Sequence, residues 1–338
     1  MVNLWRWKLD LEGNNGDTAY AYAVGRIRVL ETRLLGRETV ERLLEARDVE
    51  ETLGILRERN FGEEIQPLSF ENTLEKERGS VYRIFNELCL DEAIQEWILS
   101  KHDYQNLKAL LKASRSGEGT IPSLSSWGTV PPEELKNIVK EKRIRDLPTH
   151  LQRAIEKGLS QEDPLEIDLT LDHEMFRFWL ERGEEIHSDF LKGLFQTILD
   201  LENIKTFFRI RWRKGEKNFL ERALFFNGRN QRERFFKAFE SPWEEIPSIF
   251  FATPYEKILR EGGEYLEQEG SFARLEKLCD DQLIHYLRFT KLITFGIEPV
   301  IAYLYARENE LKILRLIFLG KIFEVPKERI KVRLPDVY

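Results

Sequence analysis

Apolar residues recur at steps of three and four along most of the chain, the spacing of one face of an α-helix. Tyr20, Val24 and Ile27 begin one such stripe, and Val300, Leu304 and further apolar residues form another near the C-terminus. The pattern predicts helices over residues 18–35, 39–47, 71–88, 90–115, 132–142, 146–158, 171–186, 187–213, 230–239, 242–250, 254–261, 271–290 and 297–320, and one more that begins near Asp48. The predicted fold class is all-α.

Strand-like alternation is nearly confined to the beginning of the chain. Trp5 and Trp7 point to one side of residues 4–11, whereas Arg6 and Lys8 point to the other. We expect a short extended N-terminal arm over residues 1–17. An arm packed onto the body is the interpretation that we favour, and a docking arm is the alternative.

Two helix ends carry recognisable signals. Asp48, followed three residues later by Glu51, is a variant of the capping box. Pro299 falls in the first turn of the last predicted helix, where its missing N–H costs nothing.

One polar motif recurs three times. Residues 103–108 (Asp-Tyr-Gln-Asn-Leu-Lys) are repeated at 200–205 (Asp-Leu-Glu-Asn-Ile-Lys) and, more loosely, at 307–312 (Arg-Glu-Asn-Glu-Leu-Lys). The lysines are 97 (205−108) and 107 (312−205) residues apart, too long a period for a solenoid. We expect three tandem homologous helical domains, at residues 18–120, 121–217 and 218–338, after the arm at 1–17. The structural motif residues are Asp103, Asn106, Lys108, Asp200, Asn203, Lys205, Glu310 and Lys312.

The motif allows two interpretations. Asp and Asn three residues apart share a helix face, so each copy could form a polar functional site. Alternatively, these side chains bond backbone groups at neighbouring helix ends and fix one register within an apolar interface. We favour the structural interpretation, because a site needed for chemistry would rarely survive as three near copies.

Composition narrows the class of protein. Of the 338 residues, 33% are charged, and the net charge of −7 comes from interspersed acidic and basic residues. A nucleic-acid-binding chain would usually be basic. Cys89 and Cys279 lie in apolar helical patterns, as buried thiols in a reducing compartment do. We expect neither a secretory leader, because Arg6 and Lys8 interrupt the start, nor a membrane-spanning segment.

Motifs for catalysis and cofactor binding are missing. The sequence contains no GxxxxGK[ST] loop and no GxGxxG after a strand. His173-Glu174 begins like a zinc-binding helix but lacks the second histidine four residues on, and the five histidines have no metal-ligand spacing. We therefore expect no catalytic residue, cofactor, metal, nucleic acid or small-molecule substrate.

Several segments resemble one family. Residues 296–315 (Gly-Ile-Glu-Pro-Val-Ile-Ala-Tyr-Leu-Tyr-Ala-Arg-Glu-Asn-Glu-Leu-Lys-Ile-Leu-Arg) resemble the C-terminal signature of the C-subunit family of V/A-type ATPases (ATP synthases), whose eukaryotic relatives are the d subunits of V-ATPases. Residues 200–205 resemble its middle-domain signature, residues 20–35 its N-terminal helix, and residues 325–338 its tail. The resemblance covers about residues 18–338. The third copy departs from the motif with Arg307 and Glu310.

The resemblance implies a funnel of three helical domains with pseudo-threefold symmetry. It would lie on the cytoplasmic face of the membrane proteolipid ring, held there by partner subunits, and receive the central-stalk subunits of the D and F type. The chain would be a non-catalytic rotor coupler in ion transport driven by, or driving, ATP chemistry. A free-standing helical-repeat scaffold for soluble partners is the alternative, and an α-helical enzyme with a site between domains is a third hypothesis.

Overall fold

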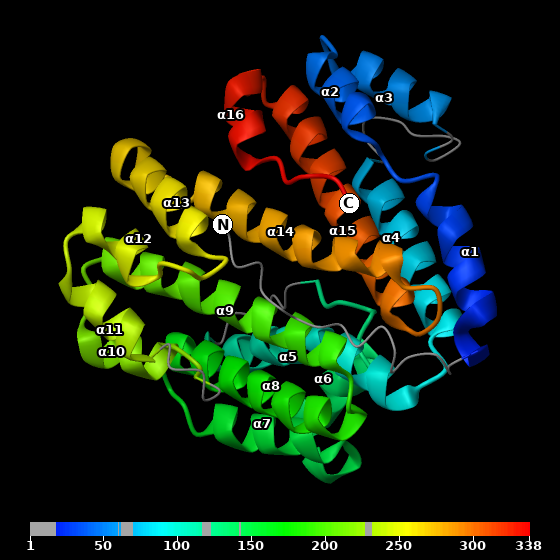
Figure 1. The fold of residues 1–338 in the computed structure, drawn as a ribbon. Coiled ribbons are helices and arrows are strands. Elements are labelled where there is room, and N and C mark those ends of the chain that lie inside the picture. The colour runs from blue at the N-terminus through cyan, green and yellow to red at the C-terminus, as the bar shows by residue number, and fades with distance from the viewer. Residues whose placement is uncertain (1–17, 60, 62–69, 117–122, 142, 227–231) are drawn as a thin grey trace. The chain divides into compact units, whose positions relative to one another are not determined.

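The computed structural model describes residues 18–59, 61, 70–116, 123–141, 143–226 and 232–338, and all regular structure within them is helical (Figure 1). The all-α prediction is confirmed. The predicted arm with Trp5 and Trp7 lies outside the described residues. Two compact units are formed: unit 1 by residues 1–89, 207–209 and 229–338, and unit 2 by residues 90–206 and 210–228. These units do not coincide with the three expected domains, so the triplication and the funnel remain predictions.

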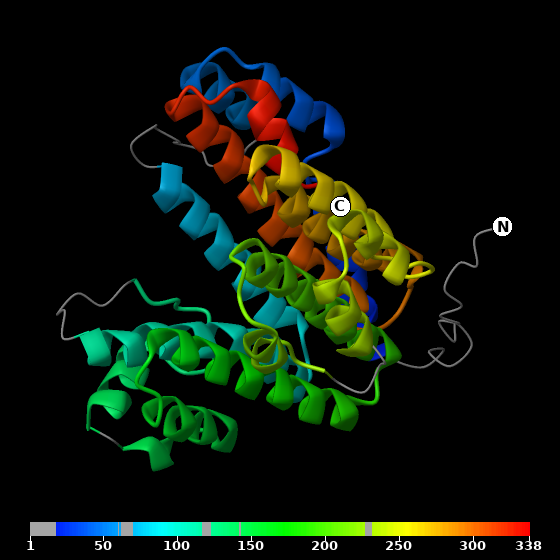
Figure 2. The same cartoon turned by 90° about the vertical axis from the view of Figure 1, so that its left-hand side faces the viewer.

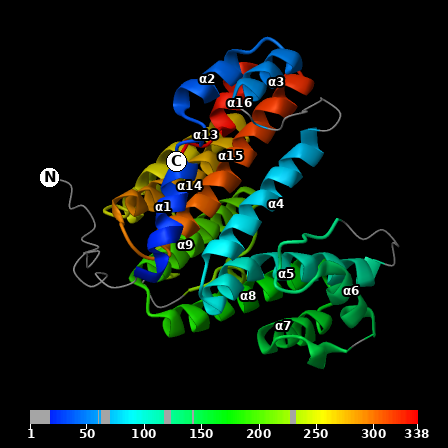
Figure 3. The same ribbon diagram turned by 90° about the vertical axis from the view of Figure 1, so that its right-hand side faces the viewer.

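Unit 1 combines helices from both ends of the chain. The long α15 lies between α1 and α4 and packs against both (Figure 3). Elsewhere in the unit, α13 packs against α14 (Figure 2). Its helices are η1 (Thr18–Tyr20), α1 (Ala21–Glu31), α2 (Arg37–Glu45), α3 (Val49–Glu58), α4 (Phe70–Leu88), α11 (Arg232–Glu240), η4 (Trp243–Glu245), α12 (Ile246–Ile249), α13 (Glu256–Glu269), α14 (Ala273–Leu287), η5 (Arg288–Leu292), α15 (Glu298–Ile322) and α16 (Lys327–Arg333).

Unit 2 is built around α8, which packs against α5 and α7. Its helices are α5 (Glu92–Ser116), α6 (Pro132–Glu141), η3 (Ile144–Asp146), α7 (Thr149–Leu159), α8 (Pro164–Ile186), α9 (Asp189–Trp212, with 207–209 counted in unit 1) and α10 (Lys217–Ala223).

Each unit has an aromatic core. In unit 1, Phe70 and Phe318 stack with their ring centroids 3.5 Å apart. In unit 2, the Trp97 indole donates to the carbonyl of Trp179 at 3.1 Å, and the Trp179 indole donates to Ser100 Oγ at 2.9 Å. Both indole N–H groups are thereby satisfied in the interior, as buried tryptophans require. Cys89 and Cys279 are both buried, as expected.

The signals at helix starts are confirmed. The Asp48 carboxylate accepts from the backbone N–H of Glu51 at 2.9 Å, and Glu51 accepts from the backbone N–H of Arg47 at 2.9 Å. The first bond satisfies an N–H that the first turn of α3 leaves free, and the second bonds the N–H of the residue before the cap. Pro299 occupies the first turn of α15.

The predicted boundaries of α1, α8 and α13 are wrong, and two short helices were not predicted. The first helix was expected to reach residue 35, but α1 ends at Glu31, and backbone bonds from Arg33 to Leu30 and from Leu34 to Glu31 form a tighter turn. Helix α8 begins at Pro164 rather than 171, because Asp163 caps it by accepting from Leu165 N–H at 2.9 Å. The short helices α10 and α16 had not been predicted.

Helix α13 also runs past its predicted end at residue 261, through Gly262 and Gly263, to Glu269. A Cβ at Gly262 would lie 2.7 Å from Leu275 Cδ1 and 3.1 Å from Leu275 Cα. Glycine is needed there for the close approach of α13 to α14. The helix ends instead at Gly270, whose φ of 64° is left-handed.

Candidate functional site

The first copy of the motif lies on α5 and bonds the segment that leads to α6. Asp103 is fully buried and accepts from Thr129 N–H at 2.8 Å, Thr129 Oγ1 at 2.7 Å and Val130 N–H at 3.1 Å. Burial raises the pKa of the Asp103 carboxyl, and these hydrogen bonds oppose that shift. Asn106 donates to the Ser125 carbonyl at 2.8 Å and accepts from Ser125 N–H at 2.7 Å. The copy therefore anchors an otherwise irregular stretch of backbone.

The second copy lies on α9 and makes the same kind of contact. Asn203 donates to the carbonyl of Phe225 at 2.8 Å and accepts from its N–H at 3.1 Å. Phe225 follows α10, so the bonded segment again lies downstream of the long helix. Asp200 accepts from Gln196 on its own helix at 2.7 Å.

The third copy, on α15, bonds two segments. Glu310, in the position of the asparagine, accepts from Leu35 N–H at 3.1 Å, just before α2 begins. Its neighbour Asn309 donates to the carbonyl of Asp336 at 2.8 Å, downstream of α16. Asn309 thus makes the contact typical of the other two asparagines. An alignment of the three copies on their lysines conceals this match. Asn309 lies one residue before the position that aligns with Asn106 and Asn203.

The motif lysines form ion pairs with carboxylates at different places in the fold. Lys108 pairs with Asp172 on α8, and Lys312 pairs with Asp280 on α14. Lys205 pairs with Glu202 on its own helix. The bonds of the motif are of the kind that the structural interpretation expects, and that interpretation stays a prediction that a variant can test.

Replacing Asn203 by leucine is expected to lower the free energy of unfolding by about 1–3 kcal/mol, because the N–H and carbonyl of Phe225 lose their partner. Urea denaturation measures this change. The same substitution at the exposed Asn218 on α10 is the control, expected within about 0.5 kcal/mol of the wild type. A variant of undiminished stability that no longer binds a partner would contradict the structural interpretation.

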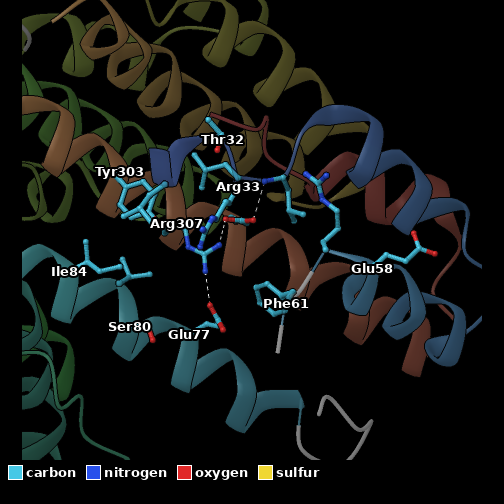
Figure 4. A pocket seen from close by; sticks show the side chains of 15 residues that line it. Thr32, Arg33, Glu58, Phe61, Glu77, Ser80, Ile84, Tyr303 and Arg307 are labelled. Atoms are coloured by element: carbon cyan, nitrogen blue, oxygen red, sulfur yellow. Dashed lines mark hydrogen bonds and ion pairs between the residues drawn. The ribbon is translucent and has the colours of Figure 1, made fainter. Parts of the chain in front are cut away.

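The third copy also borders a cavity of about 570 Å³ in unit 1 (Figure 4). Its floor is α15, with Tyr303, Arg307 and Glu310. Its other lining residues come from α1 and the turn after it, from α3 and the residues that follow it, and from α4: Leu30, Thr32, Arg33, Leu34, Leu35, Glu58, Arg59, Phe61, Glu77, Ser80, Val81 and Ile84. The sequence did not reveal this cavity, because its lining residues are far apart in the chain.

Arg307 is the most enclosed cation at the cavity. Its side chain is 12% exposed and pairs with Glu310 on the same helix and with Glu77 on α4, the latter at 2.8 Å. Burial lowers the pKa of Arg307, but its carboxylate neighbours outweigh that effect and the net shift is upward. Burial raises the pKa of Glu310, and Arg307 opposes the shift. In this cluster one guanidinium therefore faces two carboxylates.

Two buried histidines lie beside hydroxyl groups. His102 Nδ1 lies 3.0 Å from Ser125 Oγ, and His150 Nδ1 lies 3.2 Å from Tyr104 Oη. Burial lowers the pKa of His150 to about 4. Among the described residues, no three His, Cys, Asp or Glu side chains gather so as to hold a metal ion. No helix in the described ranges is both long and apolar enough to cross a bilayer.

Comparison with known proteins identifies the family. The model of the ATP synthase (C/AC39) subunit family matches residues 23–333. The C subunit of the A-type ATP synthase of Methanocaldococcus jannaschii is 25% identical, over 92% of this chain and 85% of the relative. The C subunit of the V-type sodium ATPase of Enterococcus hirae is 24% identical, over 92% of this chain and 97% of the relative. The chain belongs to the ATP synthase (C/AC39) subunit family.

Proposed function

We propose that the chain is the non-catalytic coupling subunit of a V/A-type rotary ATPase, joining the central stalk to the membrane proteolipid ring. The observation that carries the proposal is the family match over residues 23–333. In this role the chain transmits torque between the head that makes or hydrolyses ATP and the ring that moves ions. It is held at the cytoplasmic face of the membrane by its partner subunits and has no catalytic site of its own.

The helices suit a part that transmits torque. Helices α5 and α15 have 25 residues each, about 37 Å at 1.5 Å per residue. Packed helices of this length resist bending, because close-packed interiors have low compressibility. The side chains of Asn106 on α5, Asn203 on α9 and Asn309 on α15 add hydrogen bonds from long helices to neighbouring backbone. These features support a stiff body between two partners.

The partners are central-stalk subunits of the D and F type on one side and the proteolipid ring on the other. The test mixes the purified chain with the stalk pair and with the detergent-solubilised ring of the same organism, followed by size-exclusion chromatography. We expect saturable one-to-one binding to the stalk pair and a ternary complex with the ring. We also expect no ATP turnover by the chain alone.

Two results would overturn the proposal. ATP hydrolysis that co-purifies with the folded chain would contradict a non-catalytic role. Failure of the folded chain to bind either partner would favour the alternative function, a helical-repeat scaffold for soluble proteins.

A further inference from the structure

An exposed apolar patch lies where α1 meets the segment that joins α14 to α15, both in unit 1. Arg28 of α1 donates to the carbonyls of Thr290 and Ile293 at 2.7 and 2.8 Å, which holds the two elements side by side. Five large apolar side chains on these elements are more than a third exposed. They form the apolar patch: Tyr22 and Val29 on α1, Phe289 and Leu292 on η5, and Phe295 after it.

The side chains of the patch are not part of the core. Leu292 is 74% exposed and Tyr22 is 72% exposed, whereas the nearby Ile293 and Val24 point inward and are buried. A single exposed apolar residue is ordinary on a protein surface. A group of them on two adjoining elements marks an interaction surface.

The outer face of α1 has a gap within the patch. Tyr22, Gly25 and Val29 are spaced by three and four residues and share that face. Gly25 is exposed, and a Cβ at this position would meet no atom within 4 Å. A side chain from another segment can therefore lie against the backbone of α1 between Tyr22 and Val29.

The charged groups that border the patch on α1 already have partners. Arg26 pairs with Glu87, and Arg28 pairs with Glu31 at 2.8 Å. The patch therefore favours an occupant with apolar side chains over one that is recognised by its charge.

The arm at residues 1–17, which directly precedes η1 and α1, has matching chemistry. Leu11 and Thr18 are seven residues apart (18−11), and an extended chain of this length spans up to about 23 Å. Helix α1 from Ala21 to Val29 is about 12 Å long, so the arm is long enough to lie along the patch. Its alternating sequence supplies one apolar side, Trp5, Trp7, Leu9 and Leu11, and one charged side, Arg6, Lys8 and Asp10.

We propose that the apolar patch is the docking site of the arm, which binds it through its apolar side and turns its charged side to solvent. The family match begins at residue 23, so the arm adds a contact to those that the coupling function implies. While the arm is docked, it covers an apolar surface that other proteins could otherwise bind.

Limited digestion of the full chain with trypsin, followed by mass spectrometry, measures how often the arm is released. Trypsin cuts after Lys8 only while the arm is off the patch, so the rate follows the population of the released form. Leu292→Glu places a carboxylate in the apolar contact, and we expect cleavage after Lys8 to become about tenfold faster than in the wild type. Val29→Glu makes the same test from α1.

Leu165→Glu is the matched control for Leu292→Glu. Leu165 is an exposed leucine in the first turn of α8, in unit 2. Its substitution should leave the rate of cleavage after Lys8 unchanged. Thermal melts followed by circular dichroism show whether each variant is folded.

A double-mutant cycle tests for contact between the arm and the patch. Trp5→Glu alone should speed cleavage after Lys8 to a degree similar to that of Leu292→Glu. The variant that combines Trp5→Glu with Leu292→Glu should be cut little faster than either single variant, because the contact is already broken.

Three results would overturn the docking of the arm. The first is cleavage after Lys8 that is as fast in the wild type as in Leu292→Glu. The second is a double variant in which the two effects multiply, since independent effects mean that Trp5 and Leu292 are not in contact. The third is a Leu292→Glu variant with unchanged cleavage but weaker binding to the stalk pair or the ring, which would make a partner subunit the occupant. None of these results contradicts the coupling function.

Discussion

Asp103→Ala is expected to lower the free energy of unfolding by about 3–5 kcal/mol, because three donors lose their acceptor at one buried point. The donors are the N–H groups of Thr129 and Val130 and the hydroxyl of Thr129, all within 3.1 Å of the carboxylate. Asp103 has no exposed surface, so bulk water does not solvate its carboxylate in the intact fold. Equilibrium denaturation in urea measures the loss.

The surroundings of Asp103 show how tightly the carboxylate fits. A Cβ at Gly128 would lie 2.1 Å from Asp103 Oδ1, so the turn that carries the donors passes against the carboxylate. Asp103→Asn keeps one acceptor oxygen and should lose less stability than Asp103→Ala.

Asp146→Ala is the matched control for Asp103. Asp146 is exposed and pairs with Arg143 at 3.0 Å, a surface contact worth up to about 1 kcal/mol. If Asp103→Ala were no more damaging than Asp146→Ala, then water would be replacing the carboxylate, and Asp103 would not anchor the segment that leads to α6.

Much of the helical architecture could be predicted, because its cause is local. Apolar spacing identified most of the long helices, and the capping signals at Asp48 and Pro299 acted as expected. Asn106 and Asn203 bond backbone, as the structural interpretation of the repeat proposed. The apolar spacing and the caps depend on residues within a few turns of one helix. The role of the asparagines follows from the ability of an amide side chain to bond both a backbone N–H and a carbonyl.

The errors arise where tertiary contact overrides a local signal. Gly262 and Gly263 could be taken for a helix stop, yet α13 continues through them, and at Gly262 the missing Cβ leaves room for Leu275 of α14. Asn309 was missed because the third copy shifts by one residue relative to its lysine. No local pattern reports such a shift, since the position of the bonded segment decides which side chain reaches it.

The cavity could not be predicted for a related reason. Arg33, Arg59 and Arg307 are separated by 26 (59−33) and 248 (307−59) residues, and only the packing of α1, α3 and α15 in unit 1 brings them to one cavity. In the sequence, Arg307 and Glu310 were simply a departure from the motif. The structure shows that the departure creates a buried ion pair at the floor of the cavity.

Breaking this buried pair should have an effect as large as that of Asp103. Arg307→Met removes the cation that faces both Glu310 and Glu77, and we expect a loss of about 3–5 kcal/mol, the usual result when one partner of a buried ion pair is deleted. Arg315→Met on the same helix is the matched control. Arg315 pairs with Glu71 at 3.0 Å with both side chains about half exposed, so its loss should be below about 1 kcal/mol.

The effect of Arg307→Met should also depend on pH in a defined direction. Burial already raises the pKa of Glu310 above its ordinary value of 4.5, with Arg307 opposing the shift. Without Arg307 the folded-state pKa rises further. A carboxyl with a raised folded-state pKa favours folding below its unfolded-state pKa, and this contribution is lost as pH rises through the folded-state value. The deficit of Arg307→Met relative to the wild type should therefore be smallest in acid and grow as pH rises above about 4.5.

Urea denaturation of the wild type and of Arg307→Met across this pH range measures the difference between their free energies of unfolding. Taking the difference cancels the contribution of groups that titrate alike in the two proteins. A deficit that is large and constant with pH would mean that Glu310 keeps the same charge without its partner. Water entering from the adjacent cavity would then be the solvating agent. Arg307 would in that case shield the Glu310 carboxylate from the cavity as well as neutralise it.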